Sequence, residues 1–157
     1  MGQVFDCEIQ ARLRDMNVGA HVDNVEALRI LDEARLLFLR HAPLTDDGGR
    51  GGLFRDVPSH AVELVASQRV DYRAEMRFTA YQPFLVRIWV SHVARTAVTI
   101  SSELRIAADH PPAIVAETSL VFWDHTAEAS WPISDEVRAA LAAYAGEPVA
   151  LRERPGR

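Results

Sequence analysis

The sequence contains a single cysteine, Cys7, among its 157 residues. One cysteine cannot form a disulfide within the chain, and it cannot supply a cysteine-rich metal site. Cys7 lies in a stretch that reads as a strand, without a partner motif beside it, so we expect a small, partly buried residue and not a nucleophile. A chain of this length forms one domain by the usual prior and is long enough to bury a good core.

The sequence also has no excess of basic residues. Lysine and arginine together number 17 against 22 aspartates and glutamates, which gives a formal net charge of −5. This acidic balance argues against general binding to nucleic acid or to anionic membranes. We find no apolar run long enough to span a bilayer and no signal peptide, and we therefore expect a cytoplasmic protein.

Several motifs that mark a known chemistry are missing as well. The sequence has no G-x-S-x-G elbow, no H-E-x-x-H zinc motif, no Walker sequence and no G-x-G-x-x-G fingerprint. A glycine-rich stretch at 44–52 follows a helical pattern, whereas phosphate loops follow a strand and open a helix. We interpret it as a mobile connection, with a lid over a binding site as the alternative. We predict neither a metal ion nor an organic cofactor.

The longest regular pattern predicts one helix from Val25 to Ala42. Asp23 and Asn24 before it are residue types that cap helices, and Asp23 with Glu26 has the spacing of a capping box. Most positions of the segment are apolar, and its polar residues fall on one stripe, so the helix should be largely buried. A buried helix whose polar N-terminus opens towards a cleft can hold an anion or a polarised carbonyl.

Strands are predicted on both sides of this helix. Alternating, β-branched and aromatic residues indicate strands over 4–13, 61–68, 70–78, 84–93, 97–107 and 114–123. Ser134 to Ala145 predicts a short second helix that ends before Gly146. This order indicates an α+β domain over 1–147, in which one long antiparallel sheet wraps around one buried helix. Residues 148–157 are predicted to form a disordered tail.

The stretch from Arg14 to Arg40 resembles the hotdog-fold acyl thioesterases, a group that includes the 4-hydroxybenzoyl-CoA and acyl-carrier-protein thioesterase-like proteins. In that family a strand carries a D-x-D-type motif, followed by a glycine-containing turn, H-V-N-N and a helix that ends near E-x-A-R. The matching residues are Asp15-Met16-Asn17, Gly19-Ala20, His21-Val22-Asp23-Asn24 and Asp32-Glu33-Ala34-Arg35. The match runs for about two dozen residues in unbroken register. The resemblance implies the hotdog fold and the cleavage of acyl thioesters without a cofactor.

Two residues depart from the family pattern. The second aspartate of the acidic motif, often the catalytic carboxylate in the family, is Asn17, and the first asparagine of H-V-N-N is Asp23. Asn17 can neither take a proton nor attack, although its amide can hold a water or orient a carbonyl. Asp15 is a candidate replacement; alternatively, it only braces the turn. Asp23 is most simply a helix cap.

A second resemblance supplies another carboxylate. The segment Asp71-Tyr72-Arg73-Ala74-Glu75 resembles the D-Y-R-x-E segment of acyl-carrier-protein thioesterases of this fold. In that branch, a glutamate at the Glu75 position is proposed to act with a histidine at the His21 position. The resemblance therefore implies Glu75 as the water-activating carboxylate and His21 as its polar partner. On spacing alone, Glu75 is better explained as a surface ion-pair residue than as a catalytic one, and His21 is equally a cap beside the helix start.

The start of the predicted helix supplies further substrate contacts. Free N–H groups and the helix dipole beside Asp23 and Asn24 face the oxyanion that develops during hydrolysis. The family usually has a tyrosine where this chain has Ala27, and the smaller side chain leaves room for a medium or long acyl chain. Arg95 and Thr96 lie in a turn that in related proteins often touches the pantetheine or nucleotide of coenzyme A; otherwise such an arginine is merely solvated.

The sequence supports two hypotheses about function. The first is a hydrolase that cleaves acyl-CoA or acyl-carrier-protein thioesters, favoured by Glu75 with His21. The second is a non-catalytic hotdog protein that binds acyl thioesters or a protein partner, favoured by Asn17. In both cases an exposed edge strand predicts a homodimer or homotetramer, because hotdog sheets usually join edge to edge.

Overall fold

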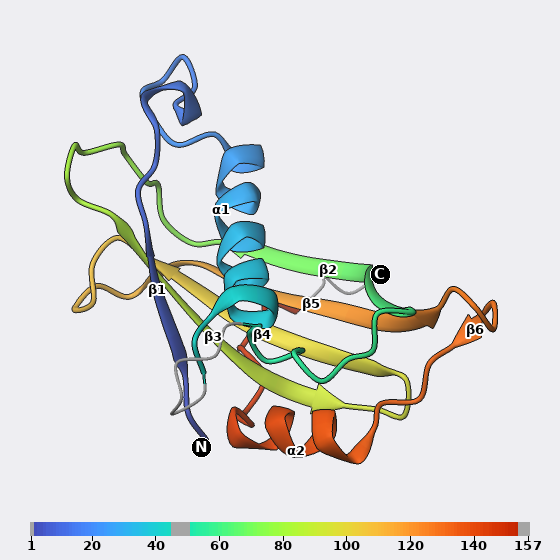
Figure 1. Cartoon of the computed structure of the whole chain (residues 1–157). Coiled ribbons are helices and arrows are strands. Elements are labelled where there is room, and N and C mark those ends of the chain that lie inside the picture. Colours follow the sequence, from blue (N-terminus) through green and yellow to red (C-terminus); the bar gives the residue numbers. More distant parts are fainter. Residues whose placement is uncertain (1, 45–50, 154–157) are drawn as a thin grey trace.

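A curled antiparallel sheet wraps around one long helix (Figure 1). The computed structural model describes residues 2–44 and 51–153. The strands are joined in the order β1-β3-β4-β5-β2, with β6 paired to β5, and these ladders are antiparallel. This arrangement confirms the predicted α+β class with one sheet around one helix. The strands are β1 (Phe5–Ile9), β2 (Ala61–Tyr72), β3 (Phe84–Val93), β4 (Ala97–Arg105), β5 (Pro112–Asp124) and β6 (Ala129–Ser130).

Helix α1 (Asn24–Leu36) lies on the concave side of the sheet and continues as a π-helical turn, η2 (Leu37–His41). Its outward stripe carries Arg29, which forms ion pairs with Glu26 and Glu33. The predicted helix over 25–42 is confirmed within a few residues, but only one of its faces is buried. The apolar side chains of that face are Ala27, Ile30, Leu31, Ala34, Phe38 and Leu39.

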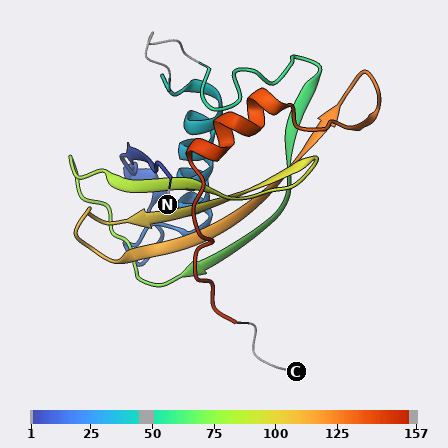
Figure 2. The same cartoon turned by 90° about the horizontal axis from the view of Figure 1, so that it is seen from below.

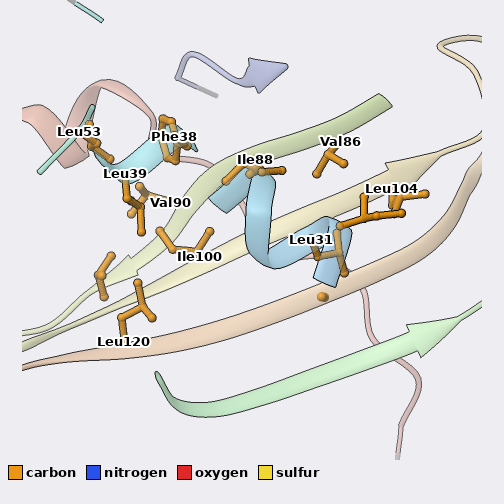
Figure 3. Packing of buried hydrophobic residues seen from close by; sticks show 14 of the residues in the cluster. Leu31, Phe38, Leu39, Leu53, Val86, Ile88, Val90, Ile100, Leu104 and Leu120 are labelled. Atoms are coloured by element: carbon orange, nitrogen blue, oxygen red, sulfur yellow. The ribbon is translucent and has the colours of Figure 1, made fainter. Parts of the chain in front are cut away.

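The inner face of the sheet closes the core against α1 (Figure 3). Alternate positions of β3, β4 and β5 point inward, and burying each large apolar side chain there contributes about 1.5–3 kcal/mol. This packing holds α1 in place and thereby determines where its N-terminus lies. The inward residues include Val86, Ile88, Val90, Ile100, Leu104, Ile114, Leu120 and Phe122.

Strand β2 is a single strand of 12 residues, so the prediction of two strands over 61–68 and 70–78 is wrong. It pairs with β5 from Ala61 to Tyr72, and a bulge shifts the register between Val65 and Ser67. A bulge interrupts the alternation of faces, which makes one strand resemble two in sequence. β2 forms one edge of the sheet, where Leu64 and Val65 are exposed. Residues 73–78 leave the sheet.

The ends of other elements differ from prediction by a few residues. β1 ends at Ile9, and a 3-10 turn, η1 (Leu13–Asp15), replaces the end of the strand predicted over 4–13. The turn forms because the Asp15 carboxylate accepts a hydrogen bond from the Arg12 N–H at 2.8 Å. The glycine-rich connection predicted at 44–52 lies largely outside the described residues. Within those residues, no helix is long and apolar enough to cross a membrane.

Helix α2 (Asp135–Ala143) agrees with the sequence, and the Ser134 hydroxyl at its start accepts from the Val137 N–H. The segment that follows differs from its predicted disorder. Residues 147–153 leave α2 and cross the outer side of the sheet (Figure 2), where Val149 is buried with Trp89. This segment shields apolar residues on the outer face of the sheet from solvent. The predicted disorder is therefore wrong for 148–153, while 154–157 lie outside the described residues.

Candidate active site

The candidate site is built on the loop that leads into α1. Backbone contacts close the base of this loop, because the Asp23 N–H donates to the Asp15 carbonyl at 2.8 Å and Met16 forms a bridge with Val22. The Val22 N–H also donates to the Met76 carbonyl at 2.7 Å, which ties the loop to the segment after β2. Figure 1 shows this loop and the segment after β2 at the same end of the sheet.

Asn17 organises the tip of the loop. Its N–H donates to the His21 carbonyl at 2.8 Å, and its side-chain oxygen accepts from the N–H groups of Gly19 at 2.9 Å and His21 at 3.3 Å. The same tip contains Ala20 with φ at 62°, a backbone conformation that favours glycine. The Asn17 oxygen is thus committed to the turn, and only its amide nitrogen is left to offer a ligand.

His21 and Glu75 meet across this end of the sheet. The His21 Nε2 lies 2.9 Å from the Glu75 Oε2. The two atoms are close but not aligned as a hydrogen bond, so Nε2, which is shielded from solvent, has no such partner among residues 2–44 and 51–153. The Glu75 side chain is 74% exposed, whereas that of His21 is 24% exposed. Because most of the Glu75 side chain is exposed, a rotation of its carboxylate would align it with His21 or turn it towards a bound water.

A cavity of about 440 Å³ opens between the start of α1 and the end of β2. Four of the residues that line it, Val22, Ala27, Met76 and Ile114, are buried and apolar. Polar side chains line the same cavity, so it suits a ligand with an apolar end and a polar reacting group. The sequence-predicted residues that line it are Asn17, His21, Asn24, Ala27 and Glu75, and the others are Val22, Tyr72, Arg73, Ala74, Met76 and Ile114.

The N-terminus of α1 borders this cavity. Asp23 is the N-cap, and its carboxylate accepts from the Val25 N–H at 2.9 Å. The predicted capping box is incomplete, because Glu26 pairs with Arg12 and Arg29 instead of reaching back to the cap. The first N–H groups of a helix lack partners inside it, so Asn24 can offer its N–H to a carbonyl oxygen in the cavity.

Asp15 does not line the cavity. Its side chain is fully buried and contacts the guanidinium groups of Arg12 at 2.7 Å and Arg29 at 3.1 Å. Burial by itself would raise the pKa of this carboxyl, but the hydrogen bonds from Arg12 and the charge of Arg29 outweigh burial and hold the pKa at about 2. Asp15 is therefore ionised and enclosed by its partners, with no access to a ligand in the cavity.

Arg95 and Thr96 are not brought to the cavity. They lie in the turn between β3 and β4, where their carbonyls accept from the N–H groups of Ile133 and Phe122, each at 2.9 Å. In the described part of the chain, no three His, Cys, Asp or Glu residues are grouped so that they could hold a metal ion.

Tyr72 is a cavity residue that the sequence analysis did not single out. Its hydroxyl donates to the Asn24 carbonyl at 3.2 Å and so joins the end of β2 to the start of α1. Burial, followed by the charge of Asp23, raises the pKa of this phenol. The sequence signal was available, because Tyr72 belongs to the D-Y-R-x-E segment.

The sequence of residues 11–141 matches the model of the thioesterase-like superfamily. The chain belongs to this superfamily. Thioester hydrolysis is the class of activity that this membership indicates. No curated protein matches the chain.

Solved structures with the same fold cover nearly all of the chain. The PA5185 protein from Pseudomonas aeruginosa is 22% identical, with 92% of this chain and 94% of that one covered and a TM-score of 0.73. Slr0204 from Synechocystis, a 1,4-dihydroxy-2-naphthoyl-CoA thioesterase, is 16% identical, with coverages of 89% and 96% and a TM-score of 0.70. The protein SAV2348 from Staphylococcus aureus, solved in complex with CoA, is 11% identical, with coverages of 98% and 91% and a TM-score of 0.73. These likenesses confirm the hotdog fold.

Proposed function

We propose that the protein hydrolyses acyl thioesters in the cavity between α1 and β2, with Glu75 as the general base. The observation that carries the proposal is the 2.9 Å contact between His21 and Glu75 at a cavity that borders the N-terminus of α1. A proton acceptor (Glu75), its polar partner (His21) and the positive end of a helix dipole therefore border the same cavity. Hydrolysis of a thioester requires such groups to activate the water and to stabilise the oxyanion.

The proposed reaction begins with the thioester carbonyl at the start of α1. The Asn24 N–H and the helix dipole stabilise the negative charge that develops on the carbonyl oxygen. Glu75 takes a proton from a water as the water oxygen bonds to the carbonyl carbon. The tetrahedral intermediate then collapses, the C–S bond breaks, and the proton on Glu75 passes to the leaving thiolate. His21 orients Glu75 through the contact between Nε2 and Oε2.

We propose a coenzyme A thioester with a medium or long acyl chain as the substrate. The apolar residues Ala27, Met76 and Ile114 would contact the acyl group, and the small side chain of Ala27 leaves depth there. Slr0204, a CoA thioesterase in name, has the same fold, which supports coenzyme A over a carrier protein.

The second candidate function is binding of acyl thioesters without turnover. Asn17 favours it, because an amide stands where the family often has a catalytic carboxylate, and its oxygen is committed to the turn. The cavity and the helix start would hold a thioester equally well in either case, so the two functions differ only in the attack by water.

A panel of acyl-CoA thioesters of increasing chain length, followed by release of free thiol, tests the proposal. We expect turnover with an optimum at medium or long chains. Calorimetric titration with the same thioesters serves as the companion measurement. Binding without thiol release would replace hydrolysis by the second function, and the absence of both would reject the cavity as a thioester site.

A further inference from the structure

We propose that Asp15 is a positioning residue, which acts through Arg29 to fix the N-terminus of α1 relative to the loop that carries His21. The inference rests on the proposed hydrolysis, because it concerns the geometry of the same site. Asp15 contacts neither the cavity nor His21, so any effect it has on the reaction must pass through other residues.

The carboxylate of Asp15 is saturated with partners. Its Oδ2 accepts from the Arg12 N–H at 2.8 Å and lies 3.1 Å from the Arg29 Nη2, while its Oδ1 accepts from the Arg12 Nε at 2.9 Å. The side chain has no exposed surface. A charge removed from water is stable only with such partners in good geometry, so the buried carboxylate dictates where both arginines lie.

Arg29 transmits this constraint to the helix. Its guanidinium is held on α1 by Glu26 at 2.8 Å and by Glu33 at 2.7 Å, one on either side along the helix. The planar guanidinium has fixed donor directions. Its Nε donates to Glu26 and its Nη1 to Glu33, so Nη2 points to Asp15. The second turn of α1 is thus docked to Asp15 through a rigid group.

The backbone of Asp15 holds the start of the same helix. Its carbonyl accepts from the N–H of Asp23, the N-cap, at 2.8 Å. Asp15 therefore fixes α1 twice, at the cap by its backbone and in the second turn by its side-chain contact with Arg29. The loop between Asp15 and Asp23 carries His21, and the helix start carries Asn24. A misplacement of about 1 Å between reacting groups can cost roughly 100-fold in rate.

The test replaces Arg29 and leaves Asp15 in place. Arg29→Met keeps the apolar stem and a good helix former, and Arg12 still pairs with the buried carboxylate. We expect kcat for thiol release to fall about 10- to 100-fold with KM unchanged. Arg29→Lys, which keeps the charge but not the fork, should recover part of the loss. Arg138→Met, which removes the contact of an arginine of α2 with the Ala94 carbonyl and lies outside the cavity, serves as the matched control with wild-type kcat.

A second readout does not depend on turnover. The imidazole resonances of His21, measured by NMR well below the melting temperature of each variant, should shift in Arg29→Met and stay in place in Arg138→Met. If the wild-type protein released no thiol, the proposed function would be wrong. The His21 resonances would still test whether Asp15 and Arg29 position the loop. An Arg29→Met variant with a lower melting temperature but wild-type kcat and His21 resonances would overturn the inference.

Discussion

At the scale of single residues, the proposed hydrolysis depends on one exposed carboxylate, Glu75. Glu75 is exposed and close to His21, whereas Asp15 is enclosed by arginines. A general base must reach a water and must change its protonation state, and only an accessible carboxylate can do both. The burial of Asp15 therefore favours Glu75 among the candidate carboxylates.

Replacing Glu75 by glutamine tests this assignment. Glu75→Gln keeps the shape of the side chain but cannot take a proton, so we expect kcat to fall by about two to four powers of ten. The fold and the affinity for acyl-CoA should stay nearly the same. His21→Ala should lose less, because His21 acts through Glu75. The measurement is thiol release, and Glu8→Gln on the exposed side of β1 is the control. Unimpaired hydrolysis by Glu75→Gln would remove Glu75 from the mechanism.

The backbone of Ala20 is the second residue-scale feature. A side chain at φ 62° costs about 1 kcal/mol, and glycine adopts this conformation freely. Glycine also has more entropy to lose on folding, so we expect Ala20→Gly to stabilise the protein by only about 0.5 kcal/mol in urea unfolding. The matched control is Ala139→Gly inside α2, which should lower the free energy of unfolding by about 1 kcal/mol. An equal decrease in the free energy of unfolding for both variants would contradict the expectation.

At the scale of elements, the C-terminal segment acts as part of the sheet's outer layer. The Trp89 indole N–H donates to the Glu147 carbonyl at 2.7 Å, and the Val149 N–H donates to the Ser101 hydroxyl at 3.3 Å. The Arg73 guanidinium donates to the Ala150 carbonyl. These contacts order a segment whose own sequence has no regular periodicity.

A substitution at Val149 measures this contribution. Val149→Ser replaces a buried apolar side chain by a polar one, so we expect the free energy of unfolding to fall by about 1–2 kcal/mol. Trp89 should become more solvated, which a red shift of its fluorescence would report. Ala150→Ser alters an exposed neighbour and should change neither quantity. Equal behaviour of the two variants would show that the segment adds no stability.

At the scale of the whole molecule, acid stability should depend on Asp15. Its pKa is about 2 in the folded protein and near 3.8 in an unfolded chain. Between these values the unfolded state binds more protons, so about 2 kcal/mol of stability is present above pH 4 and is lost as the pH falls through about 2. Urea unfolding of wild type and Asp15→Asn across this range checks the expectation. Asp15→Asn should be less stable at pH 7 and should lose less on acidification. Parallel curves would contradict it.

The free edge of the sheet leads to a prediction about assembly. Leu64 is 47% exposed and Val65 is 54% exposed on β2, and a long apolar edge strand invites pairing with another copy. We expect light scattering to give the mass of a dimer or tetramer. Leu64→Lys should shift the protein towards monomer, while Tyr81→Lys, at a fully separate exposed position, should not. A monomer mass for wild type at micromolar concentration would remove this prediction.

Local sequence patterns were sufficient for most of the secondary structure. The apolar period of α1 and the alternation of β3 and β5 record which face of each element is buried, and the capping residues Asp23 and Ser134 act within one turn. Such features depend on neighbours along the chain, so they can be predicted without the fold. The same holds for the class of the fold, because the order of elements limits how they can pack.

The candidate site required the tertiary structure. The approach of His21 to Glu75 depends on the Val22–Met76 hydrogen bond, which joins two segments on opposite sides of β2 in the chain. The resemblance to known thioesterases named both residues, but no local pattern measures their separation. Asp15 is the clearest case. From sequence it was a candidate replacement for the missing catalytic aspartate or only a brace for the turn, and its burial between Arg12 and Arg29 excludes it from the cavity. Burial and pairing are decided by contacts distant in sequence, and these decide the chemistry of a carboxylate.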